Sequence, residues 1–216
     1  MIKRCVVLFL AINLSSLYAI LGGVGLNFVQ DSFTVDGDSF SGPGDIAVVE
    51  RTDIESPIGI GGFAYLTVIP FVDFEAGFNA TFSTYNYLYA DLSGNNENIE
   101  LPMAKLSWNL SVQRPILKVP TIRMYIGAGL NGSTYTEILT FDSMKDLDPN
   151  QLEDIDYIKD ELAVSTTGGH LEVGARFKPP IIPFSLNANA RYNLVKDLVP
   201  GEDGFLTVSV GLAFAI

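Results

Sequence analysis

Seven charged side chains occupy alternate positions of segments that are otherwise almost uncharged, and they are the residues best suited to electrostatic chemistry. Three are acidic and four are basic, so their charges nearly cancel. Because charged groups are retained in an enclosed space only when they are paired, this balance predicts a network of ion pairs, with the lining of an ion conduit as the alternative. The seven are Asp73, Glu75, Lys105, Arg123, Glu172, Arg176 and Arg191.

A second candidate site is the pair His170 and Glu172, which lie two residues apart. On an extended strand this spacing points both side chains to the same side, where a carboxylate could orient an imidazole that acts as a general base. Such a pair would serve a serine nucleophile in a lipid hydrolase. No serine is tied to His170 by a sequence motif, and a structural histidine is the favoured interpretation.

Two segments carry clusters of aspartates whose oxygen atoms suit Ca²⁺ or Mg²⁺. Neither cluster has the residue pattern of an EF-hand, so a solvated acidic loop is the favoured interpretation of both. The first contains Asp36, Asp38 and Asp45, and the second contains Asp146, Asp148, Asp154 and Asp156.

Tyr85, Tyr87 and Tyr89 lie at alternate positions near the end of a strand-like segment. Their rings are a candidate aromatic site at an outer mouth, where they could stack on a sugar. The favoured interpretation is that the rings pack against one another.

Extended strands must position all of these residues. In residues 71–82, FVDFEAGFNATF, every even position is apolar, and the odd positions after Phe71 are polar or small. A period of two over this length indicates a strand, because only there do successive side chains point to opposite sides. The same pattern predicts eight strands, over residues 21–30, 58–68, 71–82, 104–112, 122–130, 171–177, 184–194 and 206–216.

Long polar loops and short proline turns alternate between these strands. In the third loop, Asp148 and Pro149 predict the start of a short helix that extends to Leu162. An even number of strands with this asymmetry predicts an all-β, eight-stranded antiparallel up-and-down barrel with long outer loops and short Pro-containing turns. The loops cover residues 31–56, 91–100, 137–163 and 196–204, and the turns lie at Pro70, 114–121 and 178–183.

The composition of the two strand faces distinguishes a membrane barrel from a soluble one. The apolar faces total 42 positions without a charge, whereas the opposing 37 positions hold the seven charges and nine glycines. A solvated exterior would be rich in Lys and Glu, and the interior of an eight-stranded barrel is just wide enough for packed side chains. We therefore expect a transmembrane barrel, with a soluble lipocalin-like barrel as the disfavoured alternative.

The N-terminus predicts export. Lys3 and Arg4 precede an apolar run, which is followed by a polar patch and by residues 17–19, LYA. This layout indicates a signal peptide over residues 1–19, cleaved near Ala19, and a barrel domain over residues 20–216. Cys5, the single cysteine, would leave with the signal.

The charge distribution excludes nucleic acid as a partner. Without Lys3 and Arg4, 11 basic residues oppose 25 acidic ones, a net charge of −14, whereas phosphate binding needs the opposite sign. Of the acidic residues, 22 fall in the four predicted long loops. The short turns hold the cations Arg114, Lys118 and Lys178.

With these features the chain resembles the small eight-stranded outer-membrane β-barrel proteins of Gram-negative bacteria. The resemblance covers residues 21–216 and rests on the signal peptide, the strand count, the loop asymmetry and the closing strand FLTVSVGLAFAI. It implies an outer-membrane location, contact with outer-membrane lipid, and recognition by the barrel assembly machinery through the C-terminal strand. Such proteins typically end on an aromatic residue, whereas here Phe214 is followed in phase by Ile216.

We therefore expect a non-enzymatic barrel with a structural or surface-interaction role, acidic extracellular loops and no cofactor. Divalent cations bound at those loops are a candidate partner. The alternatives are a porin-like or lipid-transporting barrel, and an outer-membrane lipid-modifying enzyme that uses His170 and Glu172.

Overall fold

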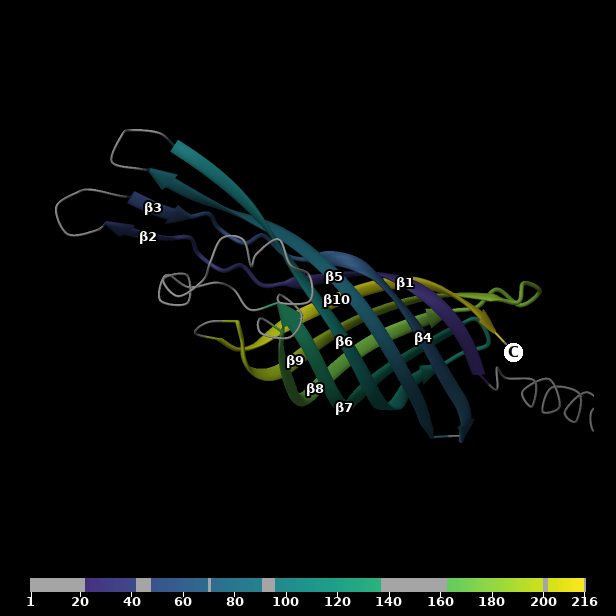
Figure 1. Cartoon of the computed structure of the whole chain (residues 1–216). Coiled ribbons are helices and arrows are strands. Elements are labelled where there is room, and N and C mark those ends of the chain that lie inside the picture. The colour runs from purple at the N-terminus through teal and green to yellow at the C-terminus, as the bar shows by residue number, and fades with distance from the viewer. Residues whose placement is uncertain are drawn as a thin grey trace, which may run out of the picture.

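Eight antiparallel strands close into one barrel in the computed structural model, which describes residues 22–41, 48–69, 71–90, 96–136, 163–199 and 202–215 (Figure 1). Each barrel strand pairs with the next, and β1 pairs with β10 to close the wall. The predicted up-and-down barrel is confirmed. Its strands are β1 (Gly22–Ser32), β4 (Ile58–Ile69), β5 (Val72–Ala90), β6 (Asn96–Lys118), β7 (Ile122–Thr136), β8 (Ala163–Phe177), β9 (Phe184–Val199) and β10 (Glu202–Ala215).

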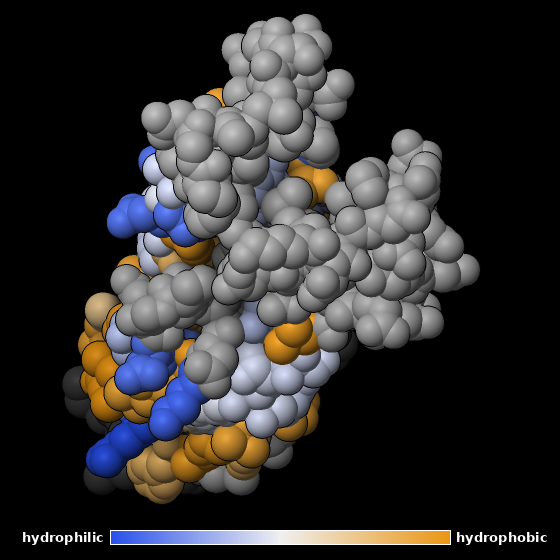
Figure 2. All heavy atoms as spheres, turned by 60° about the vertical axis from the view of Figure 1, so that its left-hand side comes forward, coloured by the Kyte–Doolittle hydropathy of each residue, from blue (hydrophilic) through white to orange (hydrophobic). Residues whose placement is uncertain are grey.

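The barrel wall is apolar outside and polar inside. On β1, Leu26 and Phe28 are 75% and 77% exposed, whereas Asn79 on β5 and Asn109 on β6 are buried. This alternation follows from the pleat of the strands, which turns successive side chains to opposite faces. Figure 2 shows outward apolar side chains, in orange, gathered along the visible wall. The predicted orientation of the strand faces is confirmed. Among the described residues, no helix is long and apolar enough to cross a membrane.

Glycines in the wall make room for large inward side chains on the neighbouring strand. Gly174 on β8 lies directly opposite Tyr125 on β7, and a Cβ at Gly174 would overlap the tyrosine ring. Gly129 lies opposite His170, and a Cβ there would be 2.7 Å from the Cε1 atom of the imidazole. These pairs explain why the inward faces contain so many glycines.

A small sheet extends beyond the barrel at the end that carries the long loops. The strands β2 (Asp38–Ser41) and β3 (Val48–Arg51) form a hairpin, and β3 pairs with the end of β5. The other edge of β5 pairs with β6 as far as Asn96. We call β2, β3, residues 86–90 and residues 96–103 the outer sheet; Figure 1 shows it projecting away from the C-terminus. The prediction of a single long loop over residues 31–56 is therefore wrong, because this segment contains β2 and β3.

Several strand ends at the long-loop end lie further out than the sequence predicts. β1 continues to Ser32, so Asp31 belongs to a strand and points into the lumen, where it is 1% exposed. β9 ends at Val199 and β10 begins at Glu202, which shortens the predicted loop over residues 196–204. The assignment of Asp31 to a solvated loop is therefore wrong.

At the short-turn end of the barrel, β6 is also longer than predicted, because it continues through Pro115 to Lys118. Proline cannot donate to a strand ladder, and the register between β6 and β7 shifts between Pro115 and Leu117. Such a bulge accommodates the missing donor, so the predicted turn over residues 114–121 begins only after Lys118. The predicted signal peptide over residues 1–19 and the predicted helix over residues 149–162 lie outside the described residues.

An apolar cluster closes the lumen below the outer sheet. Its members come from five barrel strands and from the segment that connects β1 to β4. We call it the mouth cluster, and it contains Phe33, Val35, Ile54, Tyr85, Tyr87, Met103, Tyr135, Val195 and Phe205.

Candidate functional site

Arg176 is the centre of an ion network in the lumen near the short turns. Its Nη1 atom lies 3.3 Å from Oδ2 of Asp73, and its Nη2 atom lies 2.7 Å from Oε2 of Glu75. The guanidinium also lies between two aromatic rings, 4.2 Å from the ring centre of Tyr65 and 4.6 Å from that of Tyr125. Two carboxylates and two ring faces therefore fix the orientation of one planar cation.

Two further arginines complete this network. Arg123 forms an ion pair with Asp73. The Nη2 atom of Arg191 lies 3.4 Å from Oε1 of Glu75 and 2.9 Å from Oε2 of Glu172, so it bridges two acids. The structure thus brings together six of the seven charged residues that the sequence singled out. We call them the luminal network: Asp73, Glu75, Arg123, Glu172, Arg176 and Arg191.

Lys105, the seventh charged residue, lies nearer the mouth cluster. Its Nζ atom is 2.5 Å from Oδ2 of Asp31 and 4.3 Å from the ring centre of Phe205. Asp31 also accepts hydrogen bonds from the hydroxyls of Thr81 and Thr207, at 2.9 and 2.6 Å. The prediction that Lys105 pairs with an acid of the luminal network is therefore wrong, because it pairs with an acid that had been assigned to a loop.

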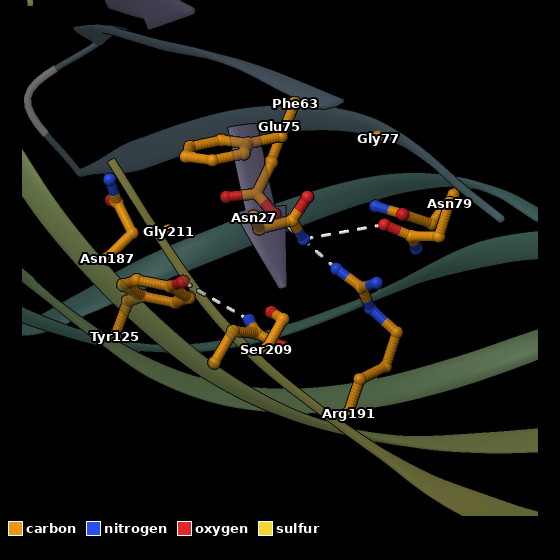
Figure 3. Close-up of a pocket in the computed structure, with 12 residues that line it drawn as sticks. Asn27, Phe63, Glu75, Gly77, Asn79, Tyr125, Asn187, Arg191, Ser209 and Gly211 are labelled. Atoms are coloured by element: carbon orange, nitrogen blue, oxygen red, sulfur yellow. Dashed lines mark hydrogen bonds and ion pairs between the residues drawn. The ribbon is translucent and has the colours of Figure 1, made fainter. Parts of the chain in front are cut away.

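Asparagine side chains fill the lumen between the luminal network and Lys105. A cavity of about 20 Å³ lies among them (Figure 3). Beside it Asn27 donates a hydrogen bond to Asn79, and Asn189 donates one to Tyr125. A second cavity, of about 10 Å³, lies on the Lys105 side. These volumes correspond to roughly one water molecule each, so neither cavity admits a larger solute.

Ser111 contacts His170, which the sequence did not indicate because 59 residues separate them. The Oγ atom of Ser111 lies 2.8 Å from Nε2 of His170. The nearest oxygen of Glu172 is 4.0 Å from the same nitrogen, while Nδ1 has no hydrogen-bond partner among the described residues. In a catalytic triad the carboxylate holds the nitrogen that faces away from the serine. The three side chains therefore lack the arrangement of a triad, and all three are buried.

Tyr85 and Tyr87 point into the mouth cluster, where they are 3% and 1% exposed. Their ring centres are 5.8 Å apart in an edge-to-face arrangement, which is favourable for aromatic pairs. Burial raises the pKa of the Tyr87 phenol to about 12. Neither ring offers a face to a sugar, and the side chain of Tyr89 lies outside the described part of the chain.

The acidic clusters are only partly described. Asp36 and Asp38 are exposed near the β2–β3 hairpin, whereas Asp45 and the cluster from Asp146 to Asp156 lie outside the described residues. Within the described ranges, no group of three or more His, Cys, Asp or Glu side chains is arranged to hold a metal ion.

A closed barrel with an apolar wall and a filled, ion-paired lumen defines a class of protein, the small transmembrane β-barrels. No protein-family model matches the chain, and no curated protein matches it. Solved structures do match: Ail, the attachment invasion locus protein of Yersinia pestis, in complex with the heparin analogue sucrose octasulfate, is 12% identical with a TM-score of 0.51, and the match covers 90% of this chain and 97% of that chain.

Two other matches have the same character. Neisserial surface protein A is 12% identical over 90% of this chain and 97% of that chain, with a TM-score of 0.47. The outer-membrane protein OprG of Pseudomonas aeruginosa is 12% identical over 90% of this chain and 91% of that chain, with a TM-score of 0.44. The chain has the fold of the small eight-stranded outer-membrane β-barrel proteins.

Proposed function

We propose that this protein is an outer-membrane barrel that presents the outer sheet as a binding surface and neither conducts solutes nor catalyses a reaction. The observation that carries the proposal is the combination of a filled lumen with a sheet that continues beyond the barrel. The filled barrel would be a rigid support for the outer sheet, because the luminal charges are paired with one another and are not arranged along an open path. The assembly machinery would recognise β10, whose outward side chains are apolar.

The edges of the outer sheet suit a binding role. Among the described residues, residues 96–103 of β6 pair only with β5, and the pairing of β6 with β7 begins at Lys105. Among the described strands, β2 pairs only with β3. Strand edges of this kind present unpaired backbone N–H and C=O groups, which are a template for an added strand from another protein.

The charge of the outer sheet indicates the chemistry of the partner. Exposed acidic side chains gather on the outer sheet and on the residues that flank β2 and β3, and the one basic side chain of the described outer sheet, Arg51, donates to the backbone oxygen of Asp36 at 2.7 Å. An acidic surface attracts a cationic protein segment or divalent cations and repels polyanions. The exposed acids are Asp36, Asp38, Glu50, Asp53 and Glu100.

This chemistry differs from that of the matched Ail structure, whose ligand is a heparin analogue. Sucrose octasulfate is an anion, and the described outer sheet here is acidic. We therefore expect binding of a basic peptide and no binding of heparin.

The test combines fractionation, conductance and binding. Purified protein should be heat-modifiable on a gel, should give no large conductance steps in planar bilayers, and should bind an immobilised oligolysine peptide in a salt-dependent manner. The variant D36N/D38N/E50Q/D53N should lose most of that binding while remaining heat-modifiable. Large, ion-selective conductance steps from the wild type would contradict the proposal and favour the porin-like alternative.

The contact between Ser111 and His170 is the observation that favours the enzyme alternative. We infer a structural role for it, because the serine is buried and the carboxylate faces the wrong nitrogen. Hydrolysis of a phospholipid or acyl ester that disappears in both S111A and H170A, with both variants folded, would establish the enzyme instead.

A further inference from the structure

Two apolar grooves cross the outward face of the wall toward the short-turn end. The first has a volume of about 1010 Å³ and lies over β5, β6, β7 and β8. The second has a volume of about 940 Å³ and lies over β1, β4, β5, β6 and β7. They are similar in size, and they differ in charge.

Alanines between larger neighbours create both grooves. In the first, Ala128 lies between Val112 and Leu171 in the register of the wall. In the second, Ala64 and Ala76 are paired with each other. Where an alanine lies between larger outward side chains, its short side chain leaves a groove between them. These side chains point away from the lumen, so the groove opens on the outer face of the barrel.

Cations line the first groove and not the second. Arg114 and Lys118 line its short-turn end, both are exposed, and within the described residues neither forms an ion pair. Beyond the bulge Lys118 is paired with the inward-facing Arg123, so it lies at the rim of the barrel, whereas Arg114 is paired with the outward-facing Ile126. Arg114 occupies an outward position two residues after Val112, so its aliphatic stem continues the apolar surface while its guanidinium reaches the membrane boundary. We call the first the basic groove and the second the neutral groove.

We propose that the basic groove binds one acyl chain of an anionic glycerophospholipid, whose phosphate pairs with Arg114 and is also attracted by Lys118 at the adjacent rim of the barrel. The short-turn end faces the leaflet opposite the outer sheet, so the occupant is a lipid of the inner leaflet. Basic side chains at the edge of a membrane-spanning surface attract anionic head groups, and an arginine can hold a phosphate through two N–H groups. The inference rests on the proposed membrane location, and it is independent of the surface role.

Native mass spectrometry of the detergent-purified full chain tests this inference. The probes are phosphatidylglycerol, phosphatidylethanolamine and lipid A, each titrated separately. The wild type should retain one phosphatidylglycerol per barrel more strongly than one phosphatidylethanolamine. R114Q/K118Q should weaken the retention of phosphatidylglycerol roughly 25-fold, because each cation near the surface contributes a factor of about five.

The chain offers one matched control for the head-group cations and one for the acyl-chain groove. Lys178 is a basic residue of another short turn and lines neither groove, so K178Q should leave phosphatidylglycerol retention unchanged. A128L should fill the basic groove and weaken retention, whereas A76L, which fills the neutral groove, should not. Every variant is checked for heat-modifiability.

Several outcomes would overturn the inference. Equal retention by the wild type and R114Q/K118Q would exclude the two cations as the head-group site. Equal effects of A128L and A76L would show unspecific lipid adhesion, and preferential retention of lipid A, or a dimer that excludes lipid, would assign another occupant. A wild type that is not heat-modifiable would contradict the membrane location itself, whereas a heat-modifiable wild type without lipid preference would contradict the groove alone.

Discussion

The ring of Tyr125 covers Gly174, the residue directly across from it on β8, and a Cβ at Gly174 would overlap that ring. The ring is therefore held in place from two sides, by the bare backbone of the glycine and by the guanidinium of Arg176, 4.6 Å from the ring centre. Aromatic side chains that cover a glycine on an adjacent strand stabilise the register between the strands.

Replacing Gly174 by alanine should destabilise the barrel by about 1–3 kcal/mol, because the added methyl group must displace Tyr125 in a filled lumen. Gly169, on the same strand, is the control, since a Cβ there meets only a backbone oxygen at 3.5 Å. Urea unfolding in detergent, followed by the gel shift on heating, measures both variants. Equal stability of G174A and G169A would show that the ring does not need the glycine.

Replacing Lys105 by methionine should destabilise the barrel by about 3–5 kcal/mol, because it leaves Asp31 buried and charged without its cation. The double variant K105M/D31N should recover much of the loss, since the remaining amide can bond the hydroxyls of Thr81 and Thr207. A double-mutant cycle of unfolding free energies measures the coupling. Additive effects of the two substitutions would contradict the ion pair.

Replacing Arg176 by lysine should also destabilise the barrel, although the charge is conserved. A lysine ammonium cannot lie flat between Tyr65 and Tyr125 or reach two carboxylates as a fork, so we expect a loss of about 2 kcal/mol. R114K at the exposed end of β6 is the control and should change stability little. Unfolding midpoints of the two variants decide the matter, and similar values would exclude a special role for the guanidinium.

Replacing residues 37–52 by a Gly-Ser linker should leave the barrel as stable as the wild type. The hairpin of β2 and β3 pairs with β5 only beyond the region that closes the barrel, and the bridge between Val35 and Ile54 remains in place. The shortened chain should be heat-modifiable with an unchanged unfolding midpoint. A large drop in that midpoint would mean that the hairpin belongs to the barrel core.

Much of the fold follows from the sequence, because a period of two leaves little freedom in a closed wall. The segment around Phe74 and Phe78 already separates a lipid-like face from a luminal face. Isolated charges such as Arg123 and Arg191 on the second face indicate an enclosed network, since unpaired charges are not retained there. Both inferences depend only on local alternation.

Other features depended on contacts between distant residues. Asp31 looks like a loop residue because Gly, Ser and Asp follow it, although Val29, Asp31, Phe33 and Val35 continue the inward alternation of β1. That alternation was the signal that could have placed it. No local sequence pattern predicts the contact between Ser111 and His170 or the pairing of β3 with β5. Each contact joins residues far apart in the sequence and forms only when the strands pair in the observed register.

The pairing of Gly23 on β1 with Ala215 on β10 determines when the barrel can close during folding. Because β1 pairs with β10, both strands must be synthesised before the barrel can close. Until then β1 and β10 each have an unpaired strand edge that can pair with another chain. Contacts between residues so far apart in the sequence also form slowly. Any truncation that removes β10 should therefore yield aggregates and not a smaller barrel.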